Sequence, residues 1–152
     1  MKIPLLVDDL YGGLRAFKGI MIMGPRFAGF IKFILDSGSP DTIIGTMDAS
    51  SLNIPVANLP DTDSDKQVVG LDGAIISLKL IKNANLVLID DKGSSIKIIL
   101  PIYVNSKHIQ KIRGQETQGN PSVLGVDFLL KNKFKFIFDP YKKEAYLEKE
   151  DN

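Results

Sequence analysis

The chain has 152 residues, of which 44% are hydrophobic, enough for one well-cored domain and too few for two ordinary ones. Its 19 Lys and Arg residues against 18 Asp and Glu residues do not support a global electrostatic attraction to nucleic acid, anionic membrane or acidic substrates. The chain contains no cysteine, which excludes disulfides, thiolate zinc sites and Cys nucleophiles and is compatible with a reducing compartment.

The beginning of the chain, MKIPLLVDDL, has a short apolar run followed by Asp8 and Asp9, which does not favour a secretory signal. The longest apolar stretches, FIKFIL and IILPIYV, are far shorter than the roughly 20 residues of a membrane-spanning helix. We therefore expect a cytoplasmic protein without a membrane span.

Apolar and polar residues alternate along much of the chain, as in half-buried β-strands. The runs AIISLKLIK at 74–82 and SIKIILPIYV at 95–104 both follow this period of two. Residues 85–90, NLVLID, are apolar on both faces and predict an interior strand. The segments GLDGA at 70–74 and DDKG at 90–93 predict hairpin turns, because their residues tolerate a positive φ.

The C-terminal part of the chain predicts one helix and one further hairpin. Residues 127–132, DFLLKN, have a helical pattern, with Asp127 expected as a cap at its start. Residues 134–148 predict a strand, an Asp-Pro turn and a second strand, whereas 48–66 is the one long stretch expected to be irregular. With no linker, repeat or low-complexity tail, the sequence predicts a single, mainly β domain over residues 1–152.

A candidate catalytic motif, Asp36-Ser37-Gly38, directly follows the apolar residues 33–35. An Asp-[Ser/Thr]-Gly triplet alone carries little weight, because it occurs by chance in roughly one chain of this size in fifteen. Its context is more informative. A second apolar strand follows in SPDTIIG, and PSVLGVDFLL at 121–130 places apolar-apolar-Gly-x-Asp before the predicted helix.

With these features the sequence resembles the retropepsin-like aspartic proteases, a single-domain family that includes the retroviral proteases. FILDSGSPDTII is similar to the family's catalytic loop, VVGLDGAIISLKL at 68–80 to its flap, and VLGVDFL at 123–129 to the segment before its helix. The resemblance implies a closed, β-barrel-like acid-protease fold with one short helix near 127–132. Two departures are Ser39, where many retroviral members have Ala, and Val126, where Arg is frequent; neither is a catalytic group.

The resemblance implies that Asp36 is the catalytic residue of an aspartic endopeptidase that cleaves extended polypeptides without a cofactor or metal. Such hydrolysis needs one carboxylate to take a proton from water and a second acid to polarise the carbonyl. Two carboxyls about 3 Å apart cannot both ionise, so they share a proton, and aspartic proteases are the standard example of this pair. Ser37 fits the family's role of bonding to the partner loop, and Gly38 permits close approach because it has no Cβ.

Substrate contacts are expected from Gly38 and from the flap, which would cover an extended peptide held by backbone hydrogen bonds. The flap residues that the resemblance assigns to substrate binding are Val69, Gly70, Leu71, Asp72 and Gly73.

The second carboxylate of the pair is expected from another copy of the chain. No other Asp-[Ser/Thr]-Gly triplet exists in the sequence, and the chain is too short for the two lobes of a pepsin-like enzyme. A C2 homodimer places Asp36 on both sides of its axis, as a symmetric pair requires. We expect the dimer to form by strand pairing of the terminal segments MKIPLLV and EAYLE, since family members interleave their ends at this interface.

The alternative function is a catalytically inactive homodimer of the same fold that binds peptides or scaffolds a partner. Such a module has no need of Asp-Ser-Gly at this position, so the intact motif favours the enzyme.

The acidic residues Asp61, Asp63, Asp65 and Asp72 have the spacing of a calcium loop. However, Lys66 replaces the turn glycine and no amphipathic helices flank the segment, which favours a solvated acidic loop.

Two further patterns favour structural explanations. His108 is the single histidine, and a zinc site or Ser-His-Asp triad would have no second identifiable member, so we expect a surface residue. The aromatic and lysine residues of KNKFKFIFDPYKK are typical of strands that bind nucleic acid. The alternation of Phe134, Phe136 and Phe138 also fits a half-buried strand, and the net charge of +1 favours that interpretation. Asp127 is expected to cap or brace the helix rather than to catalyse.

Overall fold

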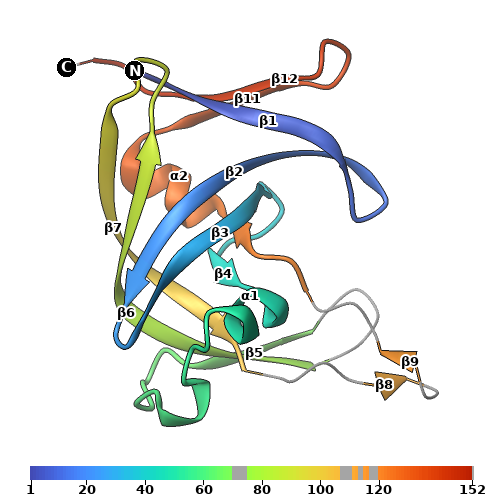
Figure 1. The fold of residues 1–152 in the computed structure, drawn as a ribbon, viewed down its shortest axis with the longest axis vertical. Helices are drawn as coiled ribbons and strands as arrows, with labels where there is room; N and C mark the ends of the chain where they lie inside the picture. Colours follow the sequence, from blue (N-terminus) through green and yellow to red (C-terminus); the bar gives the residue numbers. More distant parts are fainter. Residues whose placement is uncertain (70–74, 107–110, 113–114, 117–119, 152) are drawn as a thin grey trace.

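The computed structural model describes residues 1–69, 75–106, 111–112, 115–116 and 120–151, which form mainly β-strands (Figure 1). The strands are β1 (Lys2–Leu10), β2 (Gly13–Gly24), β3 (Phe27–Leu35), β4 (Ile43–Ile44), β5 (Lys66–Val69), β6 (Ile75–Ile89), β7 (Ser95–Asn105), β8 (Lys111–Ile112), β9 (Gln115–Glu116), β10 (Val123–Leu124), β11 (Lys135–Asp139) and β12 (Glu144–Glu148). The helical elements are α1 (Thr46–Ser51), the 3-10 helix η1 (Val56–Asn58) and α2 (Val126–Asn132). The predicted mainly β class is confirmed.

A ring of strands closes the main sheet on itself. In the described part of the chain, one sheet has the strand order β11-β12-β1-β2-β3-β10-β4-β7-β6-β5, and a further pairing joins β2 to β6. In that pairing Met21 lies opposite Val87, and Met23 lies opposite Asn85. The strands from β2 round to β6 therefore form the closed, barrel-like arrangement that the acid-protease resemblance implied.

The hydrophobic core lies inside this ring. In β7, Ile98, Leu100, Ile102 and Val104 are buried, whereas most residues between them point outward. This is the alternation expected of a strand with one face on the core. Burial of an aliphatic side chain of this size contributes about 1.5–3 kcal/mol, so the ring is stabilised mainly by its inward faces.

β6 is one continuous strand where the sequence predicted two. Its register with β7 shifts between Ile81 and Ala84, as in a β-bulge, and both of these residues are buried. The bulge lets a single strand keep its apolar face inward across a break in the alternation. The predicted turn at 90–93 is confirmed, with Asp90 Oδ1 accepting from the Lys92 and Ser94 amides.

The expectation of irregular structure across 48–66 is wrong in part, because this stretch contains most of α1 and all of η1. Ala49 and Ile54 are buried and anchor the segment on the core. Helix α1 has Gly45 as its N-cap with no side-chain cap, so it lacks the polar cap by which sequence patterns locate a helix start.

The predicted short helix near 127–132 is confirmed as α2, but its cap is different. The N-cap is Gly125, and Asp127 lies inside the first turn. The helix begins earlier because two carbonyls of the loop between β3 and β4 accept from its first amides: Val126 N donates to Ser39 O and Asp127 N donates to Pro40 O.

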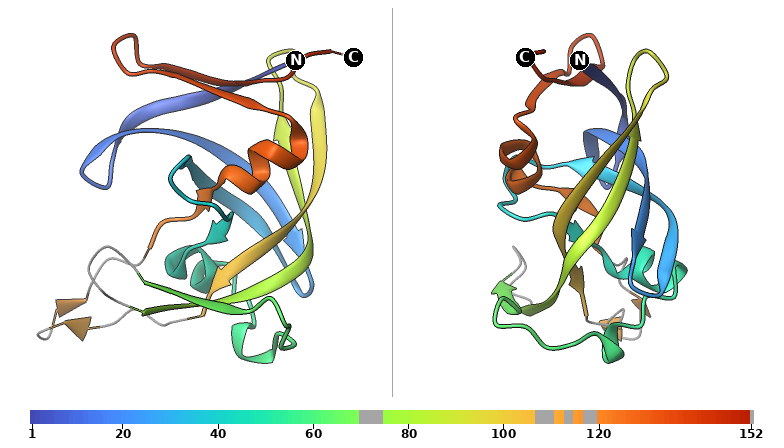
Figure 2. Two further views of the ribbon diagram at one scale, coloured as in Figure 1. Left: turned by 180° about the vertical axis from the view of Figure 1, so that it is seen from behind. Right: turned by 90° about the vertical axis from the view of Figure 1, so that its left-hand side faces the viewer.

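The terminal strands pair with each other within one chain, and Figure 2 shows the N- and C-termini side by side. Lys2 of β1 lies opposite Glu148 of β12, and Leu5 lies opposite Ala145. The other side of β12 pairs with β11 along its whole length. The prediction that EAYLE pairs with a second chain is therefore wrong, because both edges of β12 are already occupied.

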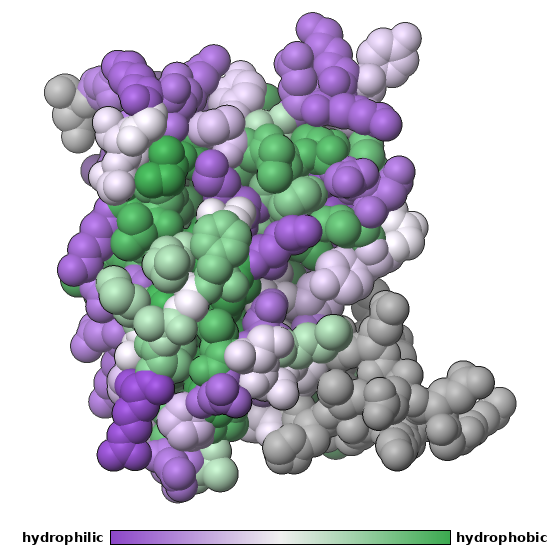
Figure 3. All heavy atoms as spheres, viewed as in Figure 1, coloured by the Kyte–Doolittle hydropathy of each residue, from purple (hydrophilic) through white to green (hydrophobic). Residues whose placement is uncertain are grey.

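On the face drawn in Figure 3, apolar atoms gather over β2, β3 and β6 on the outside of the sheet. No helix in the described ranges is long and apolar enough to cross a membrane.

Candidate active site

Asp36 lies at the end of β3, where the chain leaves the sheet and turns toward β4. Its own amide donates to Leu124 O at 3.0 Å, in line with the parallel pairing of β3 and β10. Its carboxylate is half-buried and accepts from the Gly38 amide at 2.9 Å. This bond fixes the orientation of one carboxylate oxygen and leaves the other for additional contacts.

The loop that carries Asp36 is interlocked with the segment before α2. Thr42 Oγ1 donates to Asp127 Oδ1 at 2.8 Å and accepts from the Gly125 amide at 3.1 Å. A Cβ on Gly125 would lie 2.3 Å from Asp41 O, so only glycine lets the two segments approach this closely. The two motifs singled out in the sequence, 36–38 and 123–129, are thus brought into direct contact.

A second brace, which the sequence analysis missed, lies behind this contact. The Ser122 hydroxyl is almost fully buried; it donates to Asp48 Oδ2 at 2.6 Å and accepts from the Gly45 amide at 2.9 Å. A Cβ on Gly45 would lie 1.9 Å from Asn120 O. The sequence does show polar residues, Asp48 and Ser122, near the two motifs. However, residues 48 and 122 are too far apart in the sequence for their contact to be inferred.

Ser37 and Gly38 are exposed beside Asp36. A bond from Ser37 to the loop of a partner chain, and contact of Gly38 with a substrate, fit this exposure and stay predictions.

The segment predicted as a flap, 68–80, spans parts of β5 and β6, which pair antiparallel with Val69 opposite Ile75; its role as a flap stays a prediction. Val69 is 74% exposed at the end of β5 and points away from the core. The other four residues assigned to substrate binding, Gly70, Leu71, Asp72 and Gly73, lie outside the described residues.

An ion pair joins β5 to the loop that carries Asp36. Lys66 Nζ lies 2.5 Å from Asp41 Oδ2 and 4.8 Å from the centre of the Tyr103 ring. The hydrogen bond to Asp41 raises the pKa of the Lys66 ammonium above its ordinary value. This contact holds the base of the hairpin over the loop that presents Asp36.

Two of the three acidic residues of 61–65, Asp61 and Asp65, make structural contacts, and Asp63 is exposed. The pKa of the Asp65 carboxyl lies below its ordinary value, because it accepts from the Leu80 and Thr62 amides and from the Thr62 hydroxyl. Asp61 pairs with Lys79 at 2.7 Å. Among the described residues no group of His, Asp and Glu is placed to hold a metal ion; Asp72, the last position of the calcium spacing, lies outside them.

The aromatic residues near the C-terminus pack as the half-buried strand interpretation predicts. Phe134 is buried and stacks on Phe128, with ring centres 5.7 Å apart, and Phe136 and Phe138 stack on each other against the core. These rings are used in packing and do not form an open stacking surface. His108 lies outside the described residues.

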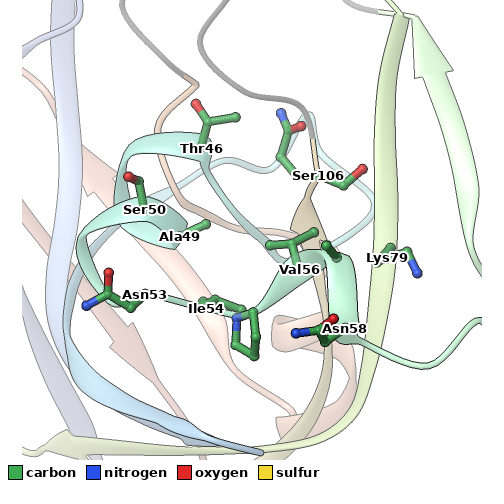
Figure 4. Close-up of a pocket in the computed structure, with 12 residues that line it drawn as sticks. Thr46, Ala49, Ser50, Asn53, Ile54, Val56, Asn58, Lys79 and Ser106 are labelled. Atoms are coloured by element: carbon green, nitrogen blue, oxygen red, sulfur yellow. The ribbon is translucent and has the colours of Figure 1, made fainter.

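A cavity of about 730 Å³ lies between the α1–η1 segment and the strands β6 and β7 (Figure 4). The buried part of its lining includes Thr46, Ala49 and Ile54, and Lys79 forms part of one wall. None of the residues proposed for catalysis or substrate binding lines it, so this cavity is separate from the candidate active site.

Comparison with solved structures finds a similar fold in the crystal structure of a retropepsin-like aspartic protease from Rickettsia conorii. The TM-score is 0.57, the alignment covers 97% of this chain and 89% of that chain, and 19% of the residues are identical. No protein-family model matches the sequence, and no curated protein matches it. The similarity shows that the chain has a retropepsin-like, acid-protease fold.

Proposed function

We propose that this chain, with its retropepsin-like fold, is an aspartic endopeptidase whose active site combines Asp36 from two copies of the chain. The observation that carries the proposal is the position of Asp36. It stands half-buried on a loop that is locked to the segment before α2 by Thr42, Gly125 and Asp127. The fold alone does not require Asp-Ser-Gly at this point, whereas an aspartic protease does.

In the proposed mechanism, the two Asp36 carboxyls face each other across a two-fold axis and share one proton. The ionised member takes a proton from water, which attacks the peptide carbonyl, while the protonated member donates to the carbonyl oxygen. The Gly38 amide, which donates to Asp36 Oδ1, fixes the orientation of the carboxylate. No cofactor or metal takes part.

The proposed substrate is an extended polypeptide that lies between the catalytic loop and the flap. We assign backbone contacts to Gly38 on the floor and to residues 69–73 of the flap. The Lys66–Asp41 ion pair supports this assignment, because it ties the flap strand to the same loop that carries Asp36.

Residues 1–152 are proposed to form one domain that acts as a homodimer. Because β12 pairs on both sides within one chain, we place the dimer contact at the catalytic loops, where Ser37 and Gly38 are exposed. The cytoplasmic location expected from the composition stays a prediction.

The test is cleavage of an unfolded protein by the wild type and by Asp36→Asn, with products identified by mass. We expect cleavage by the wild type with a bell-shaped pH dependence and a maximum on the acid side of neutrality, because one carboxyl is ionised and the other protonated. Asp36→Asn should fold normally and leave the substrate intact. An Asp36→Asn protein that cleaves as the wild type does would favour the inactive, peptide-binding alternative and would assign the activity to a contaminant.

A further inference from the structure

The outward face of four neighbouring strands, β3, β2, β6 and β7, carries a mostly apolar surface. The strand registers place side chains on this face in two adjacent rows: Phe30, Met21, Val87 and Lys97 in one, and Ala28, Met23, Asn85 and Ile99 in the other. Ile89 continues the same face of β6. We call the apolar members of this set the outer patch; they are Met21, Met23, Ala28, Phe30, Val87, Ile89 and Ile99.

The outer patch is unusually open for residues of this size. Phe30 is 66% exposed and Ile99 is 51% exposed, and Met21, Met23 and Ile89 are each about 40% exposed. Figure 3 shows apolar atoms gathered on the face of the molecule over β2, β3 and β6. Single exposed apolar residues are ordinary, but a contiguous group on one face marks an interaction surface.

Phe30 is held on this surface by a glycine on the next strand. A Cβ on Gly19 would lie 2.2 Å from the Phe30 ring, so the ring covers Gly19 directly. The ring therefore lies along the sheet instead of extending into solvent or turning into the core. The surface presented to a partner is broad, with the methionine side chains adjacent to the ring.

The charges on these strands all have one sign. The segments of β2, β3, β6 and β7 contain no Asp or Glu, although they contain six basic residues, which are Arg15, Lys18, Lys32, Lys79, Lys82 and Lys97. Of these, Lys97 lies next to Val87 of the outer patch. Lys32 lies two residues after Phe30 on β3, with its ammonium over the Phe17 ring. The chain as a whole is nearly neutral, with a net charge of +1, so its carboxylates are segregated to other elements.

We propose that the outer patch docks on the surface of a lipid bilayer that contains anionic headgroups. Met, Phe and Ile side chains on one face enter the interfacial region, and lysines beside them contact the headgroups. A protein partner that used the exposed aromatic ring as an anchor would require the ring to project into a pocket. The Phe30 ring instead lies along the sheet, and the cavity next to α1 shares no residue with the patch.

The proposed orientation leaves the candidate active site accessible. Phe30 lies on β3, six positions before Asp36, which follows the end of this strand. Six positions correspond to about 20 Å along an extended strand. The outer patch contains no residue of the catalytic loop or the flap. Docking and the proposed protease activity are therefore independent, and each can be tested without the other.

The test is co-sedimentation with vesicles of phosphatidylcholine, alone or mixed with phosphatidylglycerol. We expect binding that requires phosphatidylglycerol and decreases with added salt. The double variant Met21→Ser/Phe30→Ser and the double variant Lys32→Glu/Lys97→Glu should each reduce binding by about tenfold or more. All four side chains are exposed, so thermal unfolding should confirm that both variants fold.

Matched controls are available on other faces. Leu130 on α2 is 74% exposed, and Lys135 lies at the start of β11; Leu130→Ser and Lys135→Glu should bind vesicles as the wild type does. Three outcomes overturn the proposal. The first is no binding to the anionic vesicles, and the second is an equal loss in the control variants. The third is association of the protein with itself in the absence of lipid, abolished by Met21→Ser/Phe30→Ser, which would make the patch a contact between copies.

Discussion

Thr42 and Asp127 connect the two halves of the candidate active site through one hydrogen bond. The Thr42 hydroxyl donates to Asp127 Oδ1 at 2.8 Å and accepts from the Gly125 amide at 3.1 Å. Thr42 is fully buried, so water does not replace this hydroxyl when it is removed. The Thr42 side chain therefore holds the loop that carries Asp36 against the segment before α2.

Thr42→Val removes this hydroxyl with almost no change in shape. We expect the free energy of unfolding to fall by about 1–3 kcal/mol, because a buried amide and a carboxylate oxygen each lose a partner. Urea unfolding measures the loss. The matched control is Thr46→Val, since Thr46 Oγ1 is also buried but has no hydrogen-bond partner in the described structure. The control should be neutral or stabilising, and equal losses in the two variants would contradict the assigned role of Thr42.

Asp127→Asn tests whether a second carboxylate of the same chain takes part in the chemistry. The amide oxygen of Asn still accepts from the Thr42 hydroxyl and the Phe128 amide, while the acid is removed. We therefore expect peptide cleavage to fall by less than about tenfold, against a loss of about a thousandfold or more in Asp36→Asn. Rates measured on one peptide under identical conditions provide the comparison. A loss in Asp127→Asn as large as that in Asp36→Asn would make Asp127 the partner acid.

Lys66→Met removes the ion pair between β5, the strand proposed to carry the flap, and the loop that carries Asp36. The pair is partly exposed, so we expect stability to change by less than about 1 kcal/mol. The larger effect should be on kcat/KM for peptides, because the base of the proposed flap loses its contact with Asp41. The control is Lys79→Met on β6, which removes the ion pair with the exposed Asp61 and the hydrogen bond from Lys79 to Leu59 O. If both variants retain the wild-type kcat/KM, the Lys66–Asp41 contact has no part in substrate binding.

Asp65 is expected to stabilise the fold at neutral pH and to lose this contribution in acid. Hydrogen bonds from the Leu80 and Thr62 backbone keep its pKa below the ordinary value. A carboxyl whose pKa is lower in the folded protein stabilises the fold above its unfolded pKa of about 3.9, and the contribution is lost as pH falls through the folded pKa. Asp65→Asn should therefore lower the urea midpoint at pH 7, with a difference that shrinks below about pH 4. The control is Asp63→Asn, because Asp63 is exposed. A difference in urea midpoint between wild type and Asp65→Asn that stays constant with pH would contradict this role of Asp65.

The period-two pattern predicted strands within β6 and β7, because one face of each lies on a shared core, whereas no strand was predicted over β2. The burial of alternate residues in β7 is an example. The same reasoning predicted two strands where β6 is continuous, since a bulge at Ile81 and Ala84 interrupts the alternation without ending the strand. Helix α1 was missed because its start lacks a polar cap.

The candidate site was predictable only where its residues are adjacent in sequence. Asp36-Ser37-Gly38 and the segment before α2 were both identified, but the contacts of Thr42 with Asp127 and of Ser122 with Asp48 join distant parts of the chain. The pairing of the terminal strands was predicted between chains and occurs within one chain, where β12 has neighbours on both sides. Strand propensity indicates which segments form strands, and it determines neither which strands pair nor whether the partner belongs to the same chain.

The central claim is that one active site uses Asp36 from two chains, and subunit mixing tests it most directly. Wild type should be incubated with a threefold excess of Asp36→Asn, with exchange verified by native mass spectrometry of a mass-tagged mutant. Random exchange leaves about one quarter of the wild-type subunits in wild-type dimers, so cleavage per wild-type subunit should fall to about one quarter. Undiminished cleavage after verified exchange, or full activity from a preparation shown to be monomeric, would contradict the shared site.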